Sequence, residues 1–326
     1  MNTVASTTRP HSGRRTIVPA VDNLATIALP ALRGVFAPIA LLTVTVLLTF
    51  VAIGQAQRTA PHADAVAAQP VVNIFANPSA DSDVTSQVLY GSGVVILEKK
   101  EGWTKIRTAD EYTGWVASSD LRPGVYPADH RLMRVSTIGL NVYREPDVTK
   151  HAPMLHLPWE SILEAIPDAP GISERWLAVR LVDGRTGWVQ RGDVTTTPSA
   201  PLSIDETIAL GKRFLGITYT WGGVSSFGFD CSGFVQMLAR QRGYEIPRDA
   251  DAQAAWSGVS AVDRKALLPG DLLYFGSSPA HITHTGMYIG NGEFIHDTVH
   301  DHPGVQISRL DDQPWTHLLV ASRRIK

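Results

Sequence analysis

The alternation of hydrophobic and polar positions changes several times along this chain, and the changes divide it into segments. The first is an apolar run, VFAPIALLTVTVLLTFVAIG, of about 20 residues without a charge, which is the length a helix needs to cross a bilayer. Four arginines precede the run and one follows it closely, so the positive-inside bias exports the rest of the chain. We therefore expect a cytoplasmic tail over residues 1–34 and a transmembrane helix or signal anchor over residues 35–55. The alternative is a signal peptide whose cleavage releases the protein.

Residues 56–69 are rich in alanine and polar side chains and show no periodic apolar face, which predicts a linker. After it, short apolar runs of period two are broken by Gly, Asp and Asn turns, as in small all-β domains. This pattern occurs twice, because EGWTKIR and TGWV in the first stretch return as ERWLAVR and TGWV in the second. The repeat predicts two copies of one small β-barrel, over residues 70–124 and 132–197.

The pattern changes again over residues 203–326. Ser203 followed by Glu206 forms a capping box that predicts a helix start, and a second helix is expected from Cys231 onward. From Asp271 the sequence alternates between apolar and polar positions around glycine-rich turns, as strands do. Helices followed by an antiparallel sheet predict an α+β domain.

The amino-acid composition limits the classes of binding partner that we expect for this multidomain chain. Hydrophobic residues make up 44% and charged residues 18%, and the formal net charge is −2. No basic stripe is present to neutralise phosphates, so nucleic acid is not an expected partner. The single cysteine of an exported chain has no internal disulfide partner, so Cys231 is either a buried small hydrophobe or a thiol kept free for use.

The surroundings of Cys231 favour the second interpretation. The segment YTWGG leads to DCSG, after which the second helix begins, so the thiol lies at a helix N-terminus. Unpaired N–H groups and the helix dipole favour a thiolate there, and such positions bring a cysteine pKa to ~3.5–7.5. The same N–H groups are placed to hold an oxyanion.

Two histidines flank a predicted hairpin turn at Gly290-Asn291-Gly292. A strict two-residue loop puts His284 and His296 on opposite faces of the hairpin. A three-residue loop, in which a type I turn is followed by a left-handed Gly292, pairs Gly286 with His296 and puts both imidazoles on one face. We expect the bulged form, in which His296 hydrogen-bonds His284 and fixes its tautomer.

The elements YTWGG, DCSGF, PGDLLYF and HTGMYIGNGEFIH, in this order, resemble the NlpC-type cell-wall cysteine peptidases, which are papain-like enzymes with a permuted chain order. The resemblance covers nearly all of residues 203–326. It implies that Cys231 is the nucleophile, His284 its base and His296 the orienter, and that Tyr219 borders the active site. Thr285 departs from the family, in which a valine is common, and we expect this change to leave the chemistry intact.

Two SH3-like modules before such a domain make the chain similar to the γ-D-glutamyl-L-diamino acid endopeptidases, a branch that includes murein dipeptidyl peptidases. Enzymes of this branch recognise a free N-terminal L-alanine through the aspartate of DCSG and through acidic and tyrosine side chains of the first SH3-like domain. The resemblance therefore implies substrate-binding roles for Asp230, Ser232, Tyr112 and Asp83. The expected substrates are peptidoglycan stem peptides, and the expected location is the cell envelope, outside the cytoplasm.

Other functions stay open at this point. A zinc hydrolase is suggested by the many histidines of the last segment, but no His-Glu-x-x-His helix is present, and we expect no metal or cofactor. A non-catalytic wall-binding module would not need Cys231, His284 and His296. An amidase or acyltransferase, or an endopeptidase that acts on intact peptidoglycan, would share the same thiol chemistry.

Overall fold

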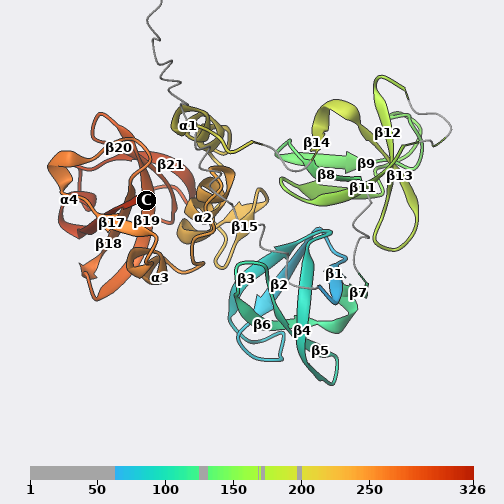
Figure 1. Ribbon diagram of the computed structural model, residues 1–326, viewed down its shortest axis with the longest axis horizontal. Coiled ribbons are helices and arrows are strands. Elements are labelled where there is room, and N and C mark those ends of the chain that lie inside the picture. Colours follow the sequence, from blue (N-terminus) through green and yellow to red (C-terminus); the bar gives the residue numbers. More distant parts are fainter. Residues whose placement is uncertain (1–62, 125–130, 168, 170–172, 197–199) are drawn as a thin grey trace, which may run out of the picture. The chain divides into compact units, whose positions relative to one another are not determined.

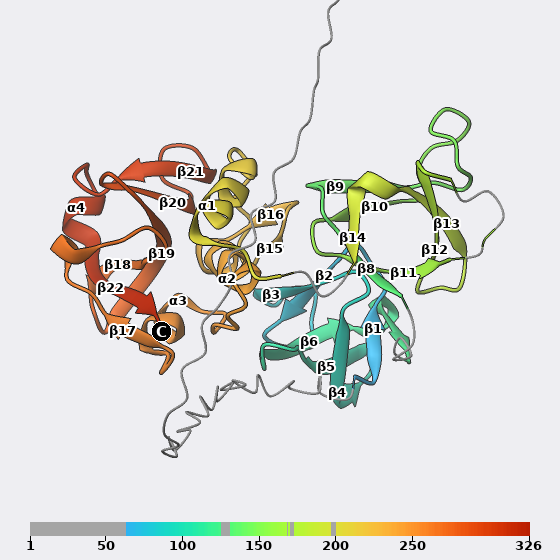
Figure 2. The ribbon, with the colours of Figure 1, turned by 45° about the horizontal axis from the view of Figure 1, so that its top comes forward.

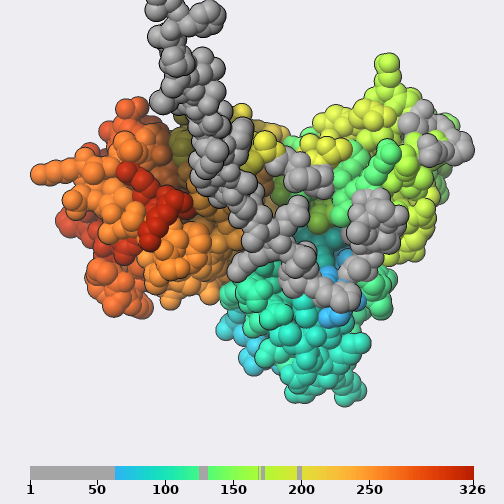
Figure 3. All heavy atoms as spheres, viewed as in Figure 1, coloured from blue at the N-terminus to red at the C-terminus, as the bar shows by residue number. Residues whose placement is uncertain are grey.

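A computed structural model describes residues 63–124, 131–167, 169, 173–196 and 200–326, which are coloured in Figures 1 and 3. The described residues all belong to one compact unit, Ala56–Lys326. The predicted tail over residues 1–34 and the predicted transmembrane helix over residues 35–55 lie outside the described residues. Within the described part of the chain, no helix has both the length and the apolar character needed to span a membrane.

The first β module comprises residues 63–124 and is built around one sheet with the strand order β3-β2-β6-β5-β4-β1-β7. Its antiparallel strands surround a core of small apolar side chains that includes Ile74, Ile106 and Val116. The strands are β1 (Ala65–Ala67), β2 (Val71–Phe75), β3 (Val84–Leu89), β4 (Gly93–Lys100), β5 (Trp103–Arg107), β6 (Thr113–Ala117) and β7 (Leu121–Pro123).

Strand β1 lies inside the segment 56–69 that was predicted to be a linker. The first β module therefore begins before the predicted boundary at residue 70. Ala65–Ala67 pairs with both β4 and β7, and its three side chains are buried. Three small residues are too few to show a strand period in the sequence, so the neighbouring strands decide their conformation.

The second β module comprises the described residues between 131 and 196. It has a five-stranded sheet with the order β13-β12-β11-β8-β14 and a two-stranded sheet of β9 and β10. Its strands are β8 (Leu132–Val135), β9 (Gly139–Val142), β10 (Leu155–Pro158), β11 (Ile162–Ile166), β12 (Trp176–Arg180), β13 (Thr186–Gln190) and β14 (Val194–Thr196).

The internal repeat of the sequence appears as equivalent hairpins in the two β modules. In the β5–β6 hairpin Trp103 pairs with Ala117, and in the β12–β13 hairpin Trp176 pairs with Gln190 at the equivalent register. Each hairpin is followed by one turn of 3-10 helix and a short strand. The repeated letters therefore fold into the same local structure.

The C-terminal domain comprises residues 200–326 and has the expected α+β architecture. Its antiparallel sheet has the order β17-β22-β18-β19-β20-β21; α1 and α2 lie on one side of this sheet and α4 on the other (Figures 1 and 2). Ser203 caps α1 through the predicted capping box with Glu206. The helices are α1 (Ile204–Arg213), α2 (Cys231–Gln241), α3 (Ala250–Ala255) and α4 (Trp315–Leu318). The strands are β15 (Val224–Ser225), β16 (Gly228–Phe229), β17 (Val259–Ala261), β18 (Leu272–Ser278), β19 (His281–Gly290), β20 (Glu293–Thr298), β21 (Gly304–Arg309) and β22 (Leu319–Ile325).

Aromatic side chains connect the modules. Tyr90 of the first β module lies in the core of the second, where its hydroxyl accepts a hydrogen bond from the Val182 N–H at 2.9 Å. Trp159 of the second β module packs in the core of the C-terminal domain, with its ring centroid 5.7 Å from that of Phe214. Each β module thus contributes an aromatic side chain to the core of the module that follows it in the chain.

Candidate active site

The start of α2 places Cys231 beside strand β19. Asp230 is the N-cap of the helix, and its Oδ1 accepts a hydrogen bond from the Gly233 N–H at 2.7 Å. Gly233 has no room for a side chain, because a Cβ there would lie 2.2 Å from the Gly223 carbonyl oxygen. The backbone N–H groups of Thr285 on β19 and of Ser232 both face the sulfur of Cys231. The thiol therefore lies next to the strand that carries His284.

Burial determines the protonation state of this thiol. Cys231 is 9% exposed, and burial, together with the negative charge of Asp230, raises its pKa to about 12, although the two backbone N–H groups lower it in part. The sequence predicted the opposite direction from the helix N-terminus. The cost of an ion in an apolar environment outweighs the helix dipole here, so the free protein holds a neutral thiol at neutral pH.

The β19–β20 hairpin has the register that brings both imidazoles to one face. Met287 pairs with Ile295, which places Gly286 opposite His296, as expected. The loop itself differs from the prediction. Asn291 and Gly292 both have positive φ and form a two-residue turn, and the extra residue lies in the strand between Tyr288 and Gly290. The extra residue that places both imidazoles on one face therefore lies in the strand, as a bulge, and not in a three-residue loop.

The two histidines form a directed hydrogen-bonded chain. Nε2 of His284 lies 2.8 Å from Nδ1 of His296, and Nε2 of His296 lies 3.0 Å from Oγ of Ser308 on β21. For His284 to act as a base, its Nε2 must carry the proton and donate to His296, whose own Nε2–H then donates to Ser308. This tautomer leaves Nδ1 of His284 unprotonated, as a base requires. No local pattern pointed to Ser308, because only the pairing of β20 with β21 brings it to His296.

Aromatic rings enclose the histidine pair. The ring of Trp315 has its centroid 5.2 Å from that of His284 and 4.8 Å from that of His296, and Phe275 and Phe294 pack against the same pair. Burial in this cluster lowers the pKa of His284 to about 3 and holds the pKa of His296 well below its ordinary value. Both imidazoles are therefore neutral at physiological pH.

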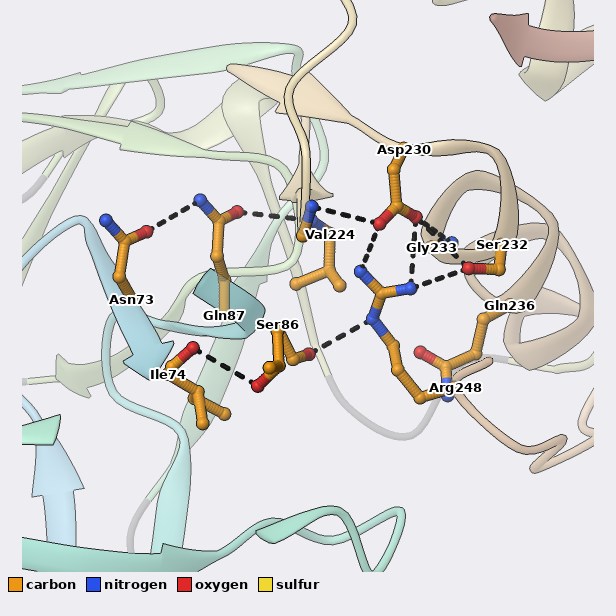
Figure 4. A network of polar contacts seen from close by, with 12 residues as sticks. Asn73, Ile74, Ser86, Gln87, Val224, Asp230, Ser232, Gly233, Gln236 and Arg248 are labelled. Atoms are coloured by element: carbon orange, nitrogen blue, oxygen red, sulfur yellow. Dashed lines mark hydrogen bonds and ion pairs between the residues drawn. The ribbon is translucent and has the colours of Figure 1, made fainter. Parts of the chain in front are cut away.

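A buried arginine holds the two residues that flank Cys231 (Figure 4). Arg248 donates to both carboxylate oxygens of Asp230, at 3.0 and 2.6 Å, and to the hydroxyl of Ser232 at 2.7 Å. Asp230 and Ser232 were expected to face a substrate ammonium, but their polar atoms have partners inside the protein. Sequence reasoning missed Arg248, since an arginine beside a proline carries no local sign of burial.

Tyr219, which was expected to border the active site, lies near Cys231 and Asp230. It is half-buried, and burial, with a smaller contribution from the negative charge of Asp230, raises its pKa. Its hydroxyl therefore stays protonated and can donate a hydrogen bond. Asp297 follows His296 on β20 and is fully buried, and the backbone N–H of Thr298 lies close enough to its carboxylate to lower its pKa in part.

The two residues expected from the first β module occupy different environments. Tyr112 lines a cavity of about 260 Å³ between the modules, and burial and the charge of Asp249 raise its pKa. Asp83 is exposed, and its chain neighbour Val84 packs against Gly222 of the YTWGG segment. Tyr112 thus shares the cavity with Asp249, which sequence reasoning missed, whereas Asp83 does not line it. The charged and aromatic residues of the cavity are Asp110, Glu111, Tyr112, Glu245, Arg248, Asp249 and Trp256.

The histidines of the last segment do not gather into a metal centre in the part of the chain that the structure describes. No group of three or more His, Cys, Asp or Glu side chains is arranged there to hold a metal ion.

Comparison with known proteins identifies the families to which the domains of this chain are similar. A model of the NlpC/P60 family matches residues 216–324, and a model of the bacterial SH3 domain matches residues 70–122. A gamma-D-glutamyl-L-lysine dipeptidyl-peptidase of Bacillus subtilis is 30% identical over 256 residues, which cover 75% of this chain and 82% of that protein.

Two further relatives come from Bacillus cereus. Its gamma-D-glutamyl-L-lysine dipeptidyl-peptidase is 32% identical over 65% of this chain, and the matched region spans 66% of that protein's length. The crystal structure of an NlpC/P60 family protein from this organism has a TM-score of 0.69 at 24% identity and covers 80% of this chain and 99% of that one. The chain therefore belongs to the NlpC/P60 family of cysteine peptidases, with an SH3-like domain before its peptidase domain.

Proposed function

We propose that this protein hydrolyses the bond between γ-D-glutamate and the L-diamino acid of peptidoglycan stem peptides, with Cys231 as nucleophile, His284 as base and His296 as orienter. The observation that carries the proposal is the placement of the thiol beside Thr285, the residue after His284, while His284 is bonded to His296 at 2.8 Å. Relatives with this function by name are 30–32% identical to the chain.

The reaction begins from a neutral pair. The S–H of Cys231 passes its proton to Nδ1 of His284 as the sulfur attacks the γ-glutamyl carbonyl carbon. Backbone N–H groups at the start of α2 bind the oxyanion, and Tyr219 is a further donor at the border of the site. The imidazolium of His284 then protonates the leaving amine, and a thioester remains. Water, deprotonated by His284, hydrolyses the thioester and restores the thiol.

We further infer that the enzyme selects peptides with a free N-terminal L-alanine. An ammonium group needs a carboxylate, and the charge of Asp230 is already balanced by Arg248 at 2.6 Å. Asp249 lines the cavity with Tyr112, and burial raises its pKa, which the positive charge of Arg248 lowers in part. In this proposal Asp249 and Tyr112 bind the ammonium directly, Asp230 and Ser232 shape the site through Arg248, and Asp83 contributes negative charge from the surface of the first β module.

Digestion of L-Ala-γ-D-Glu-L-Lys, of the equivalent diaminopimelate peptide and of purified peptidoglycan, followed by mass spectrometry, tests the function. Release of the dipeptide L-Ala-D-Glu is expected with the wild-type protein, and none with Cys231→Ala at an unchanged melting temperature. Acetylation of the alanine amine is expected to reduce kcat/KM at least ~100-fold, because the ammonium charge that Asp249 and Tyr112 would bind is then removed. Equal rates on acetylated peptide and on intact peptidoglycan would instead identify an endopeptidase of intact wall, and cleavage of another bond would identify an amidase.

The remaining architecture is proposed as follows. The second β module is a second SH3-like domain, which is supported by the equivalent registers of its β12–β13 hairpin and of the β5–β6 hairpin.

A transmembrane helix over residues 35–55 anchors the enzyme outside the cytoplasm, which is supported by the apolar run and the arginines before it. After cell fractionation, we expect the full-length chain in the membrane fraction, where only detergent releases it. A shortened chain in the medium would show that the segment is a cleaved signal peptide.

A further inference from the structure

The interface between the first β module and the peptidase domain extends to the residues that flank the nucleophile. Arg248 is 3% exposed, and all three guanidinium nitrogens donate hydrogen bonds. Two of these nitrogens bind Asp230 and Ser232, while Nε donates to Oγ of Ser86 at 3.1 Å. Ser86 lies on β3 of the first β module and is itself 3% exposed (Figure 4). The SH3-like domain thus supplies one of the acceptors of this arginine.

The arginine holds the backbone on both sides of Cys231. Asp230 Oδ1 accepts from the Gly233 N–H at 2.7 Å, and Oδ2 accepts from the Gly222 N–H at 3.1 Å, so this carboxylate joins the first turn of α2 to the YTWGG segment. Ser232 follows the nucleophile directly and is bound by the same guanidinium nitrogen as Asp230 Oδ1. A shift of the guanidinium would therefore move both neighbours of Cys231 and the N–H groups that face the oxyanion.

We propose that Arg248 is a positioning residue for the nucleophile and that Ser86 of the SH3-like domain orients Arg248, so that this domain is part of the catalytic apparatus. The inference rests on the proposed function, in which Cys231 attacks the substrate. It assigns a catalytic consequence to a contact between residues that are 162 positions apart in the chain. A planar guanidinium with fixed donor directions suits this role, whereas an ammonium supplies the same charge without the geometry.

Ser86→Ala is the first test, and Gln87→Ala is its matched control. Gln87 accepts a hydrogen bond from the Val224 N–H at 3.1 Å across the same interface, but does not contact Arg248. For Ser86→Ala we expect kcat to fall about tenfold with KM changed less than about twofold, since misplacement of reacting groups lowers kcat. Gln87→Ala should keep the wild-type kcat, and Ser86→Thr, which retains the hydroxyl, should restore most of it. A wild-type kcat in Ser86→Ala, or an equal loss in Gln87→Ala, would overturn the proposal.

Arg248→Lys separates geometry from charge. The lysine keeps the positive charge opposite Asp230 but cannot make the bidentate hydrogen bonds to its carboxylate. Because this change leaves Asp230 and Ser232 less firmly positioned, we expect kcat to fall about a hundredfold or more in a folded protein. A kcat within about twofold of wild type would show that charge balance alone is needed, which would also overturn the proposal. If Ser86→Ala does not fold, Ser86→Cys takes its place with the same expectations, because sulfur is a weak acceptor of similar size.

A readout without substrate keeps this inference distinct from the proposed function. Cys231 is the only cysteine, so its rate of alkylation by iodoacetamide reports the thiol alone. We expect slower alkylation in Ser86→Ala and Arg248→Lys than in Gln87→Ala. If the wild-type protein cleaves no stem peptide, the substrate assignment fails while the alkylation rates still decide the role of Arg248. Equal alkylation rates in all variants would refute that role even if the peptides are cleaved.

Discussion

At the scale of single residues, burial sets the charge states of the proposed catalytic groups. Burial raises the pKa of Cys231 to about 12 and lowers that of His284 to about 3, so the thiol and the imidazole are both neutral in the free enzyme. In the proposed mechanism, a thiolate therefore forms only as the proton moves to His284 during attack on the substrate. The neutral pair also protects the single cysteine from oxidants and electrophiles, since the thiolate is the reactive form.

The pH dependence of alkylation tests the neutral pair. Because the raised pKa of Cys231 lies far above neutrality, the alkylation rate with iodoacetamide should rise about tenfold per pH unit from about pH 7 to 10. The lowered pKa of His284 excludes a titration of this histidine in that range. A rate that is level between about pH 5 and 9 would show a thiolate–imidazolium pair and contradict the prediction.

Asp297 gives a second prediction at this scale. Burial, with a contribution from the charge of Asp230, raises its pKa from 3.8 to about 8. Between these values the folded protein keeps a proton that the unfolded chain releases, so this group makes the wild type less stable as pH rises through that window. Asp297→Asn cannot ionise, and its free energy of unfolding relative to wild type should increase from acid to alkaline pH, by at most on the order of 5 kcal/mol.

Urea unfolding of Asp297→Asn and wild type at about pH 4.5 and 8.5 measures this difference. The buried histidines, whose lowered pKa values make both proteins less stable toward acid, affect the two equally and cancel in the comparison. A difference that does not vary with pH would show that Asp297 is ionised and paired in the folded state.

At the scale of elements, the β19–β20 hairpin determines whether the two imidazoles meet. Its bulge between Tyr288 and Gly290 sets the register, and the absence of a side chain at Gly286 lets the strands approach each other. A Cβ at this position would lie 2.8 Å from Cδ2 of Phe294 and 3.0 Å from Cβ of His296. The hydrogen bond between the histidines therefore depends on a glycine opposite the orienter.

Gly286→Ala should separate the strands and lengthen the His284–His296 bond. We expect kcat to fall at least about tenfold and the free energy of unfolding to fall by ~1–3 kcal/mol, as for other insertions into packed sites. Gly292→Ala is the control, because it strains a positive φ of +77° in the loop but does not approach either imidazole. Equal kcat values in the two variants at matched stability would contradict the prediction.

At the scale of the whole molecule, the modules share cores rather than only touching at their surfaces. Trp159 of the second β module is 9% exposed within the peptidase core, and its backbone N–H donates to Oγ of Ser226 at 2.8 Å. Tyr90 makes the corresponding connection between the two β modules. Such shared cores favour one cooperative unfolding transition.

Trp159→Ala should lower the stability of the whole described unit. We expect a loss of ~3–5 kcal/mol in a single calorimetric transition, because a large buried aromatic is removed from the core of another module. Trp221→Ala, in which a tryptophan that is 71% exposed is replaced, should change the free energy of unfolding by less than ~0.5 kcal/mol. A second transition that leaves the peptidase domain at its wild-type melting temperature would show that the modules unfold independently.

The sequence by itself determined the local features of this protein. The capping box at Ser203 and the helix start at Cys231 follow from residues within a few positions of one another, and the shared face of His284 and His296 follows from a single hairpin in which they are 12 positions apart. The internal repeat likewise predicted equivalent hairpins. Periodicity, capping and hairpin parity are short-range properties, so the sequence carries them directly.

Only the tertiary structure decided what depends on distant parts of the chain. Ala65–Ala67 forms a strand only because β4 and β7 pair with it, and the bulge predicted in the loop lies instead within β19. The hydrogen bond between Ser86 and Arg248 and the cavity shared by Asp249 and Tyr112 join residues that are far apart in the sequence. The tertiary structure also reversed the expected shift of the Cys231 pKa. The physical reason is the same in each case: burial and pairing are set by the groups that folding brings together, and no pattern within a short segment records them.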